Sequence, residues 1–312
     1  MTRPVEIPPL VRQTAMASGP ACIRWLDQIG GLLTQLERRW DVTVGATMTG
    51  GTASLVAEAT MADGSPAVVK LAMPSEHDGR ASLELEARVL RLAEGRGCVR
   101  LLAYDGECGA VLLERLGRQL HELGLPLPRQ LEIICSVLPP LWDVPVEGAD
   151  LPSLADKGRW LARFIGGAWE ALGRPCSERV VARAVEYADR RVAALDPDRA
   201  VLLHGDAHAW NTLEVPATPG TFKLVDIDGL VGEREYDLAI PMREYADELL
   251  AGDALALGQA RARQLARLTG LDPVRIWEWG YIERVSTGLL CLRHGHDGAQ
   301  DFLTVAEAWS RA

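Results

Sequence analysis

The chain has 312 residues, of which 48% are hydrophobic, and a formal net charge of −10. This length and composition allow a folded protein with two lobes and a substantial core. The acidic balance argues against a nucleic acid as the substrate, because binding a phosphate backbone requires a positively charged face. It is compatible with a cationic small-molecule substrate, although the same charge can serve solubility alone.

Several other classes of protein are disfavoured by the sequence. It contains no uninterrupted apolar run long enough to cross a bilayer, and its first residues lack the apolar core of a signal peptide. The six cysteines are scattered and include no C-x-x-C pair, so neither a zinc site nor a disulfide framework is indicated. We therefore expect a cytoplasmic protein that is not associated with a membrane, with an oligomeric state that the sequence leaves open.

The first part of the chain predicts a small lobe built on a sheet. A helix is expected from about residue 21 to 40, within an N-terminal helical extension that covers residues 1–40. The lobe itself covers residues 41–115, with one key helix near 80–94 and strand-like runs near 41–47, 54–60, 66–72, 98–104 and 109–115. The turn at 62–66 indicates a hairpin, so we expect five antiparallel strands.

Beyond residue 116 the pattern becomes mainly helical. Candidate helices cover about 129–142, 152–173, 177–195, 236–251, 253–269, 273–294 and 299–311. Short strands interrupt this series near 201–203 and 222–225. The sequence thus predicts an α+β protein in which residues 116–312 form a larger, mainly helical lobe.

Glycines and hydroxyl residues fill the turn between the first two strand-like runs. The turn spans residues 47–54 and includes Thr52 and Ser54. Such residues let backbone N–H groups approach a phosphate closely. The turn contains neither a P-loop motif nor G-x-G-x-x-G, so an ordinary hairpin turn is the alternative.

Lys70 is one of only three lysines in a chain with 33 basic residues. It ends a short apolar run, and an unpaired ammonium group is costly to bury, so it requires an anionic partner. The following helical segment offers Glu86 as the first choice and Glu84 as the second, and nucleotide phosphates could share the role. The alternative is a lysine that extends its ammonium group to water.

The most informative stretch runs from His204 to Asn211. Asp206 is followed by Asn211 five positions later and by Asp226 fifteen positions beyond that. This spacing is typical of kinase-type phosphotransferases, in which an Asp orients the acceptor hydroxyl and two oxygen ligands bind Mg²⁺. Apolar runs precede both segments and place the polar groups at strand ends. On its own, however, the motif could simply decorate a loop.

Taken together, these segments resemble the aminoglycoside phosphotransferases, and more closely the streptomycin-type members grouped as aminoglycoside/hydroxyurea antibiotic resistance kinases. The likeness runs from about residue 40 to 240 and is carried by residues 51–56, 62–64, 68–74, 99–102, 112–116, 204–211 and 225–238. It implies a protein-kinase-like two-lobed fold and an O-phosphotransferase that uses ATP and Mg²⁺, with GTP not excluded.

The resemblance also implies roles for individual residues. Lys70 and Glu86 would form the ion pair that holds the nucleotide phosphates, and the backbone from Glu114 to Leu116 would face the adenine. Asp206 would be the catalytic base. Asn211 and Asp226 would bind Mg²⁺, and His204 and Asp237 would be structural supports.

The acceptor is expected near Asp206 and the helices that follow Asp237, with substrate contacts from Asp206, Trp210, Glu244 and Glu283. Asp228 adds a second carboxylate after Asp226, and its role stays open. Our first hypothesis is phosphorylation of a hydroxyl of a streptomycin-type aminoglycoside, which gives resistance. The alternatives are a kinase of hydroxyurea, a sugar or an amino alcohol, and a non-catalytic nucleotide-binding module.

Overall fold

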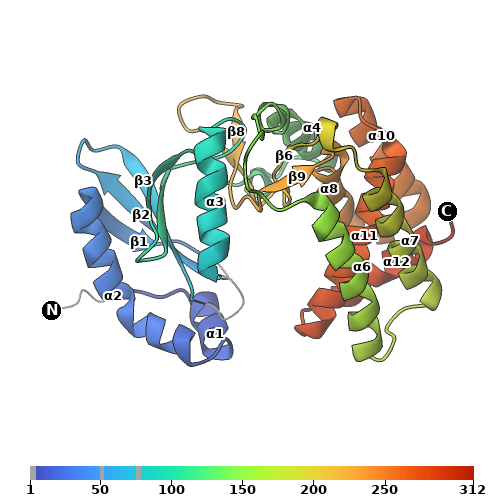
Figure 1. Ribbon diagram of the computed structural model, residues 1–312, viewed down its shortest axis with the longest axis horizontal. Coiled ribbons are helices and arrows are strands. Elements are labelled where there is room, and N and C mark those ends of the chain that lie inside the picture. Colours follow the sequence, from blue (N-terminus) through green and yellow to red (C-terminus); the bar gives the residue numbers. More distant parts are fainter. Residues whose placement is uncertain (1–4, 50–52, 75–78) are drawn as a thin grey trace. The chain divides into compact units, whose positions relative to one another are not determined.

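The computed structural model describes residues 5–49, 53–74 and 79–312, and the chain divides into two compact units. The first unit comprises Met1–Gly117 and Val215–Lys223, and the second comprises Arg118–Glu214 and Leu224–Ala312. Figure 1 shows both, coloured along the sequence. The sequence did not indicate that residues 215–223 would group with the N-terminal part of the chain.

The first unit is built on one antiparallel sheet with the strand order β1-β2-β3-β5-β4. Its strands are β1 (Val42–Thr47), β2 (Ser54–Met61), β3 (Pro66–Ala72), β4 (Leu101–Asp105) and β5 (Ala110–Glu114). Lys70 in β3 is paired with Val56 on one side and Val111 on the other. The predicted five-stranded antiparallel sheet is therefore confirmed, and Lys70 lies on an interior strand.

Helices cover both faces of this sheet (Figure 1). They are α1 (Pro9–Ala17), α2 (Pro20–Trp40) and α3 (Gly79–Ala93). The amphipathic α2 buries Ile29 and Leu36 in a core shared with Val69 of β3. Because successive side chains of a strand point to opposite faces, Lys70 points away from this core and toward the side of α3, which carries Glu86.

The second unit is mainly helical. Its helices are α4 (Leu127–Val137), α5 (Pro139–Trp142), α6 (Leu154–Ala171), α7 (Glu178–Ala194), α8 (Ala239–Arg243), α9 (Ala246–Leu250), α10 (Ala254–Thr269), α11 (Pro273–Arg293) and α12 (Ala299–Trp309). Short 3-10 helices are η1 (Leu120–Leu123), η2 (Pro197–Arg199) and η3 (Arg234–Tyr236). The short strands are β6 (Val201–Leu203), β7 (Thr212–Glu214) and β9 (Leu230–Gly232), while β8 (Phe222–Leu224) spans the division between the units.

Helix α11 forms the centre of the second unit. It packs against α6, α7, α8, α10 and α12, and its buried residues lie all around the helix, as expected for a core helix. Trp279, Tyr281 and Arg284 on α11 are fully buried. Within the described ranges, no helix combines the length and the apolar character required to cross a membrane.

Two helices that the sequence predicted as continuous are broken. The segment 129–142 divides after Leu138, because the two prolines that follow have no N–H with which to continue the helical hydrogen bonds. The segment 236–251 divides at Tyr245, whose left-handed backbone (φ 60°) no α-helix can include. This second break places Arg243 at the end of α8 and Glu244 in the turn that follows it.

Candidate active site

The loop that joins β6 to β7 spans residues 204–211 and carries His204, Asp206, His208 and Asn211. It begins where β6, paired antiparallel with β9, leaves the sheet. Asp237 holds this start: its carboxylate accepts the backbone N–H of His204 at 3.1 Å and that of Gly205 at 2.8 Å. The indole N–H of Trp142 also donates to Asp237 at 2.8 Å. These contacts fix the direction in which the loop departs.

His204 links this loop to the segment before Asp226. Its ring is fully buried, and burial lowers its pKa to about 4, so the imidazole is neutral. Nδ1 accepts the backbone N–H of Asp206 at 3.2 Å, which leaves the proton on Nε2 to bond the Val225 carbonyl at 3.0 Å. His204 therefore acts as a structural cross-link between two loops.

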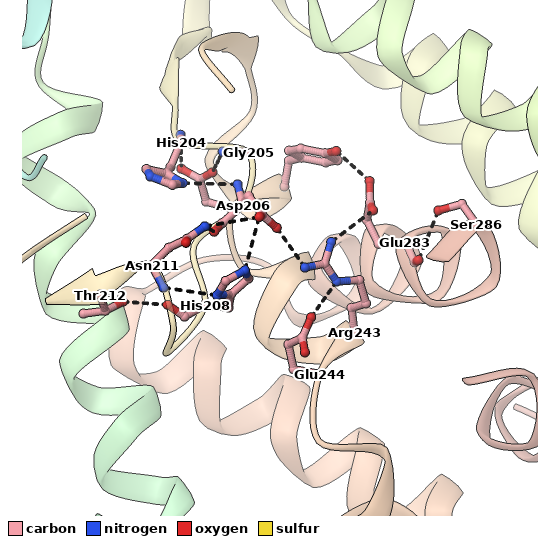
Figure 2. A network of polar contacts seen from close by, with 12 residues as sticks. His204, Gly205, Asp206, His208, Asn211, Thr212, Arg243, Glu244, Glu283 and Ser286 are labelled. Carbon is pink, nitrogen blue, oxygen red and sulfur yellow. Dashed lines mark hydrogen bonds and ion pairs between the residues drawn. The ribbon is translucent and has the colours of Figure 1, made fainter. Parts of the chain in front are cut away.

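Asp206 lies at the centre of the polar network in Figure 2. One carboxylate oxygen accepts a hydrogen bond from Arg243 Nη2 at 2.8 Å. The other lies 3.2 Å from His208 Nε2 and 3.2 Å from Asn211 Nδ2. Burial would raise the pKa of this carboxyl, but the hydrogen bond from His208 and the charge of Arg243 hold it below its usual range. Asp206 is therefore an ionised, oriented carboxylate.

Asn211 and Asp226 are brought together by the backbone. Val225 donates its N–H to the Asn211 carbonyl at 2.9 Å, directly before Asp226, whose backbone is left-handed (φ 59°). The Asn211 amide nitrogen is directed to the Asp206 carbonyl at 3.1 Å, which turns its Oδ1 the other way. One amide oxygen and one carboxylate form a donor set that suits a hard ion such as Mg²⁺ completed by phosphate and water.

The described part of the chain contains no group of three or more His, Cys, Asp or Glu side chains arranged to hold a metal ion.

Asp228 lies beside the loop of residues 204–211 that carries Asp206. Its backbone N–H donates to the His204 carbonyl at 2.9 Å, and its side chain lies against Gly205. Water reaches the side chain, but nearby protein atoms displace enough solvent to raise the pKa of the carboxyl to about 6, against the opposing charge of Lys157. Asp228 thus adds a further carboxylate to the surroundings of Asp206.

Arg243 joins three carboxylates, those of Asp206, Glu244 and Glu283, all of which were selected from the sequence as substrate contacts. Its Nε donates to Glu244 at 2.8 Å, and its Nη1 lies 3.9 Å from Glu283. Glu283 is buried and accepts the Tyr236 hydroxyl at 2.6 Å. Figure 2 shows Arg243 between Asp206, Glu244 and Glu283. The structure therefore directs both glutamates toward Arg243, a residue that the sequence analysis did not select.

Trp210 projects from the same loop and is 43% exposed. Its indole stacks on the ring of His121, with centroids 5.1 Å apart, and meets His208 edge-on at 5.7 Å. An exposed aromatic ring held on both sides is a rigid surface on which a ligand can pack.

The first unit holds the residues predicted to bind the nucleotide. Lys70 Nζ lies 2.7 Å from Glu86 Oε2, and both side chains are largely buried, at 16% and 7% exposure. The second-choice partner, Glu84, is exposed. Ser54 is buried at the start of β2, whereas Thr52 lies outside the described residues.

Glu114 is the final residue of β5, and Leu116 lies two positions beyond it. The Glu114 side chain accepts the backbone N–H of Arg100 at 2.7 Å and forms an ion pair with Lys223. Leu116 is buried. The Glu114 backbone N–H is engaged as well, because it donates to the Arg100 carbonyl at 3.0 Å, so the carbonyl of Glu114 and the residues after it are the part of this segment that could meet a ligand.

Together, the sheet with its buried lysine–glutamate pair and the helical unit with its Asp–Asn loop define a kinase-like enzyme that acts on small molecules. A family model described as aminoglycoside/hydroxyurea antibiotic resistance kinase matches residues 39–295, and the chain belongs to this family. The resemblance inferred from the sequence is confirmed.

Individual proteins support the same assignment. The chain is 32% identical over 237 residues to a hydroxyurea phosphotransferase from Kitasatospora aureofaciens, covering 75% of this chain and 67% of that protein. It is 28% identical over 295 residues to a streptomycin 6-kinase from Streptomyces glaucescens, covering 93% and 92%. A choline kinase from Streptococcus pneumoniae superposes with a TM-score of 0.60 at 14% identity, covering 90% and 100%, which confirms the kinase-like fold.

Proposed function

We propose that this kinase transfers the γ-phosphoryl group of ATP to a hydroxyl of a streptomycin-type aminoglycoside and so inactivates it. The main support is the likeness to streptomycin 6-kinases, which extends over 93% of this chain and 92% of the relative. That likeness includes the helices that follow the loop of residues 204–211. Acceptor contacts are expected in these helices.

The charges of the second unit favour a cationic acceptor. Asp206, Asp228 and Glu244 are the carboxylates near Arg243, Lys157 opposes them at Asp228, and the whole chain carries a formal net charge of −10. Streptomycin-type molecules carry positive charge, and an excess of carboxylates attracts such groups. Trp210 would provide an aromatic surface for the acceptor, while Glu283 would act through Arg243 because it is buried.

Asp206 would accept a hydrogen bond from the acceptor hydroxyl and orient it toward the phosphate. Phosphoryl transfer requires little covalent help from the protein, so positioning and charge stabilisation account for most of the catalysis. An ionised carboxylate held by Arg243, His208 and Asn211 suits this positioning role.

The first unit would bind the nucleotide and the second unit the acceptor. Lys70, kept in place by Glu86, would contact the phosphates, and the turn that includes Thr52 and Ser54 would cover them. The adenine would meet the backbone from Glu114 to Leu116, and GTP could fit the same contacts.

Asn211 and Asp226 would hold Mg²⁺, which neutralises charge on the phosphates when bound. His204 and Asp237 would support these loops from behind. The two ring nitrogens of His204 bond loop backbone, and Asp237 accepts N–H groups of three described residues, so these contacts serve the loops and not a reacting atom.

Hydroxyurea is the second candidate acceptor, because the hydroxyurea phosphotransferase is the more identical of these two relatives, at 32%. The match covers only 67% of that protein, which makes the streptomycin-type acceptor the better supported choice.

The test is ADP release with Mg-ATP against a panel of streptomycin, other aminoglycosides, hydroxyurea, choline and simple sugars. We expect turnover with streptomycin and a loss of about 10²- to 10⁴-fold in the Asp206→Ala variant. Turnover with hydroxyurea alone would move the assignment to the second candidate. No acceptor-dependent turnover with any compound would leave a nucleotide-binding module.

A further inference from the structure

The turn between α8 and α9 is held by two buried arginines. Arg284 on α11 donates from Nη2 to the carbonyl of Met242 at 2.8 Å and to that of Glu244 at 3.1 Å. Arg261 on α10 donates from Nη1 to the same Glu244 carbonyl at 2.8 Å. Two cations from two helices therefore meet at the carbonyl of Glu244, the residue that follows Arg243.

Arg284 is an unusual residue for the centre of a helical core. It is fully buried, and its guanidinium lies over the ring of Trp309 at 4.7 Å. Its Nε and Nη1 have no hydrogen-bond partner within the part of the chain that the structure describes. Burial lowers the pKa of the guanidinium to about 9. A leucine or methionine would fill this space without burying an uncompensated charge. We therefore attribute the presence of an arginine here to the hydrogen bonds that its guanidinium donates to the carbonyls of Met242 and Glu244.

The close approach of α8 to α11 depends on a glycine. A Cβ atom at Gly280 would lie 2.5 Å from the Cβ of Met242, so no larger residue fits without displacing α8. Beyond Glu244, the left-handed backbone of Tyr245 turns the chain away from the helix axis. Together, the glycine contact, the two arginines and this turn hold the C-terminal end of α8 against α11.

That position directs the Arg243 side chain at Asp206. Its Nη2 lies 2.8 Å from Asp206 Oδ1, and Glu244 holds the same guanidinium through Nε at 2.8 Å (Figure 2). Because Arg243 bonds one carboxylate oxygen while His208 and Asn211 bond the other, the plane of the Asp206 carboxylate is fixed from both sides.

We propose that Arg243 is a positioning residue for Asp206. Arg261 and Arg284 hold it in place through the carbonyl of Glu244. This proposal rests on the proposed function, in which Asp206 orients the acceptor hydroxyl, and a small displacement of such a group has a large effect on the rate.

The direct test is steady-state kinetics of the full chain with Mg-ATP and the active acceptor. We expect Arg243→Gln to lower kcat by about 10- to 100-fold while the KM for ATP changes little, because the nucleotide contacts are elsewhere. Arg243→Lys should restore part of the rate, and added guanidinium ion should partly rescue Arg243→Ala. Arg275→Gln, which removes an arginine bonded to Glu233 instead, is the matched control and should keep the wild-type kcat.

The two buried arginines and the glycine contact are tested in parallel. Arg284→Met should lower kcat in the same way and Arg284→Lys should restore it, because lysine can still donate to a carbonyl. Gly280→Ala should lower kcat, whereas Gly158→Ala, whose new methyl would meet Val192 Cγ2 at a similar 2.6 Å, should affect stability alone. Unfolding curves of each variant separate these effects.

A wild-type kcat in Arg243→Gln would overturn the proposal, and so would equal losses in Gly280→Ala and Gly158→Ala at equal stability. If Arg284→Met fails to fold, Arg243→Gln and the guanidinium rescue still decide the role of Arg243, and Gly280→Ala decides whether the position of α8 matters. Asp206→Ala separates the two proposals: full activity in that variant would remove the role of Asp206, on which the role of Arg243 rests, and no acceptor-dependent turnover in the wild-type protein would remove the proposed function.

Discussion

The carboxylate of Asp237 accepts the backbone N–H of Gly205 at 2.8 Å, across 32 positions of sequence. Gly205 is the residue directly before Asp206, so this contact fixes the point from which the loop departs. The same carboxylate is fully buried, and it also accepts the indole N–H of Trp142 and the backbone N–H of His204.

This burial predicts a pH dependence of stability. It raises the pKa of Asp237 to about 6 in the folded protein, while the three N–H donors oppose the rise. The ordinary value applies in the unfolded chain, so the folded state binds more protons between pH ~4 and ~6. The free energy of unfolding should therefore fall as the pH rises through this window, by about 3 kcal/mol at most, relative to the non-titrating variant Asp237→Asn. Urea denaturation of both proteins from acid to neutral pH measures this difference, and parallel pH profiles would contradict it.

Gly205 should tolerate no side chain. Its φ of 87° is unfavourable for other residues, and an added Cβ would lie 2.8 Å from the Cβ of Asp228. We expect Gly205→Ala to lower both kcat and stability, the latter by more than about 2 kcal/mol. Gly220→Ala is the matched control, because Gly220 has a similar φ of 79° but nothing within 4 Å, and should cost only about 1 kcal/mol. Equal unfolding free energies for the two variants would show that the contact with Asp228 has no effect.

The Lys70–Glu86 pair should be required for productive nucleotide binding. Replacing Lys70 with Met leaves a largely buried Glu86 without its lysine and, in our proposal, removes a phosphate contact. We expect kcat/KM for ATP to fall by about 100-fold or more. Arg39→Met serves as the control, because it breaks an ion pair with the buried Asp105 in the same unit. If both variants lose activity in proportion to stability, Lys70 has only a structural role.

Trp210 should affect the acceptor and not the nucleotide. It is exposed, so Trp210→Ala should change stability little, while the KM for the acceptor rises by about 3- to 10-fold. Trp160 is similarly exposed, at 47%, and stacks on Phe164 in the same unit, which makes Trp160→Ala a matched control with an unchanged KM. An equal KM in the two variants would remove Trp210 from the acceptor site.

Much of the fold follows from local patterns in the sequence. Alternating and continuous apolar runs predict the five strands of the first unit, and helical periodicity predicts α2, α6, α7, α10 and α11 close to their observed ends. The breaks at Leu138 and Tyr245 were missed. The first depends on two prolines that still permit short helices on either side, and the second on a left-handed tyrosine that is rare for that residue.

The site was predictable to the extent that it consists of a motif. The spacing of Asp206, Asn211 and Asp226 identifies the loop, but Arg243 lies outside any motif and reaches Asp206 only because α8 is held against α11. The available signal was its neighbour Glu244, since a carboxylate selected for a cationic substrate can equally be paired with an arginine beside it. Whether Glu244 binds a substrate or pairs with Arg243 depends on tertiary packing, and the spacing of residues in the sequence gives no information on that packing.

The central claim is that the chain phosphorylates a streptomycin-type acceptor with the help of Asp206. The most direct measurement is mass spectrometry of streptomycin after incubation with Mg-ATP and either the wild-type protein or Asp206→Asn, at matched folded concentration. Our account predicts a single phosphorylated product with the wild-type protein and a loss of at least about 100-fold in its rate of formation with the variant. Unmodified streptomycin in both reactions, or equal product from both proteins, would contradict it.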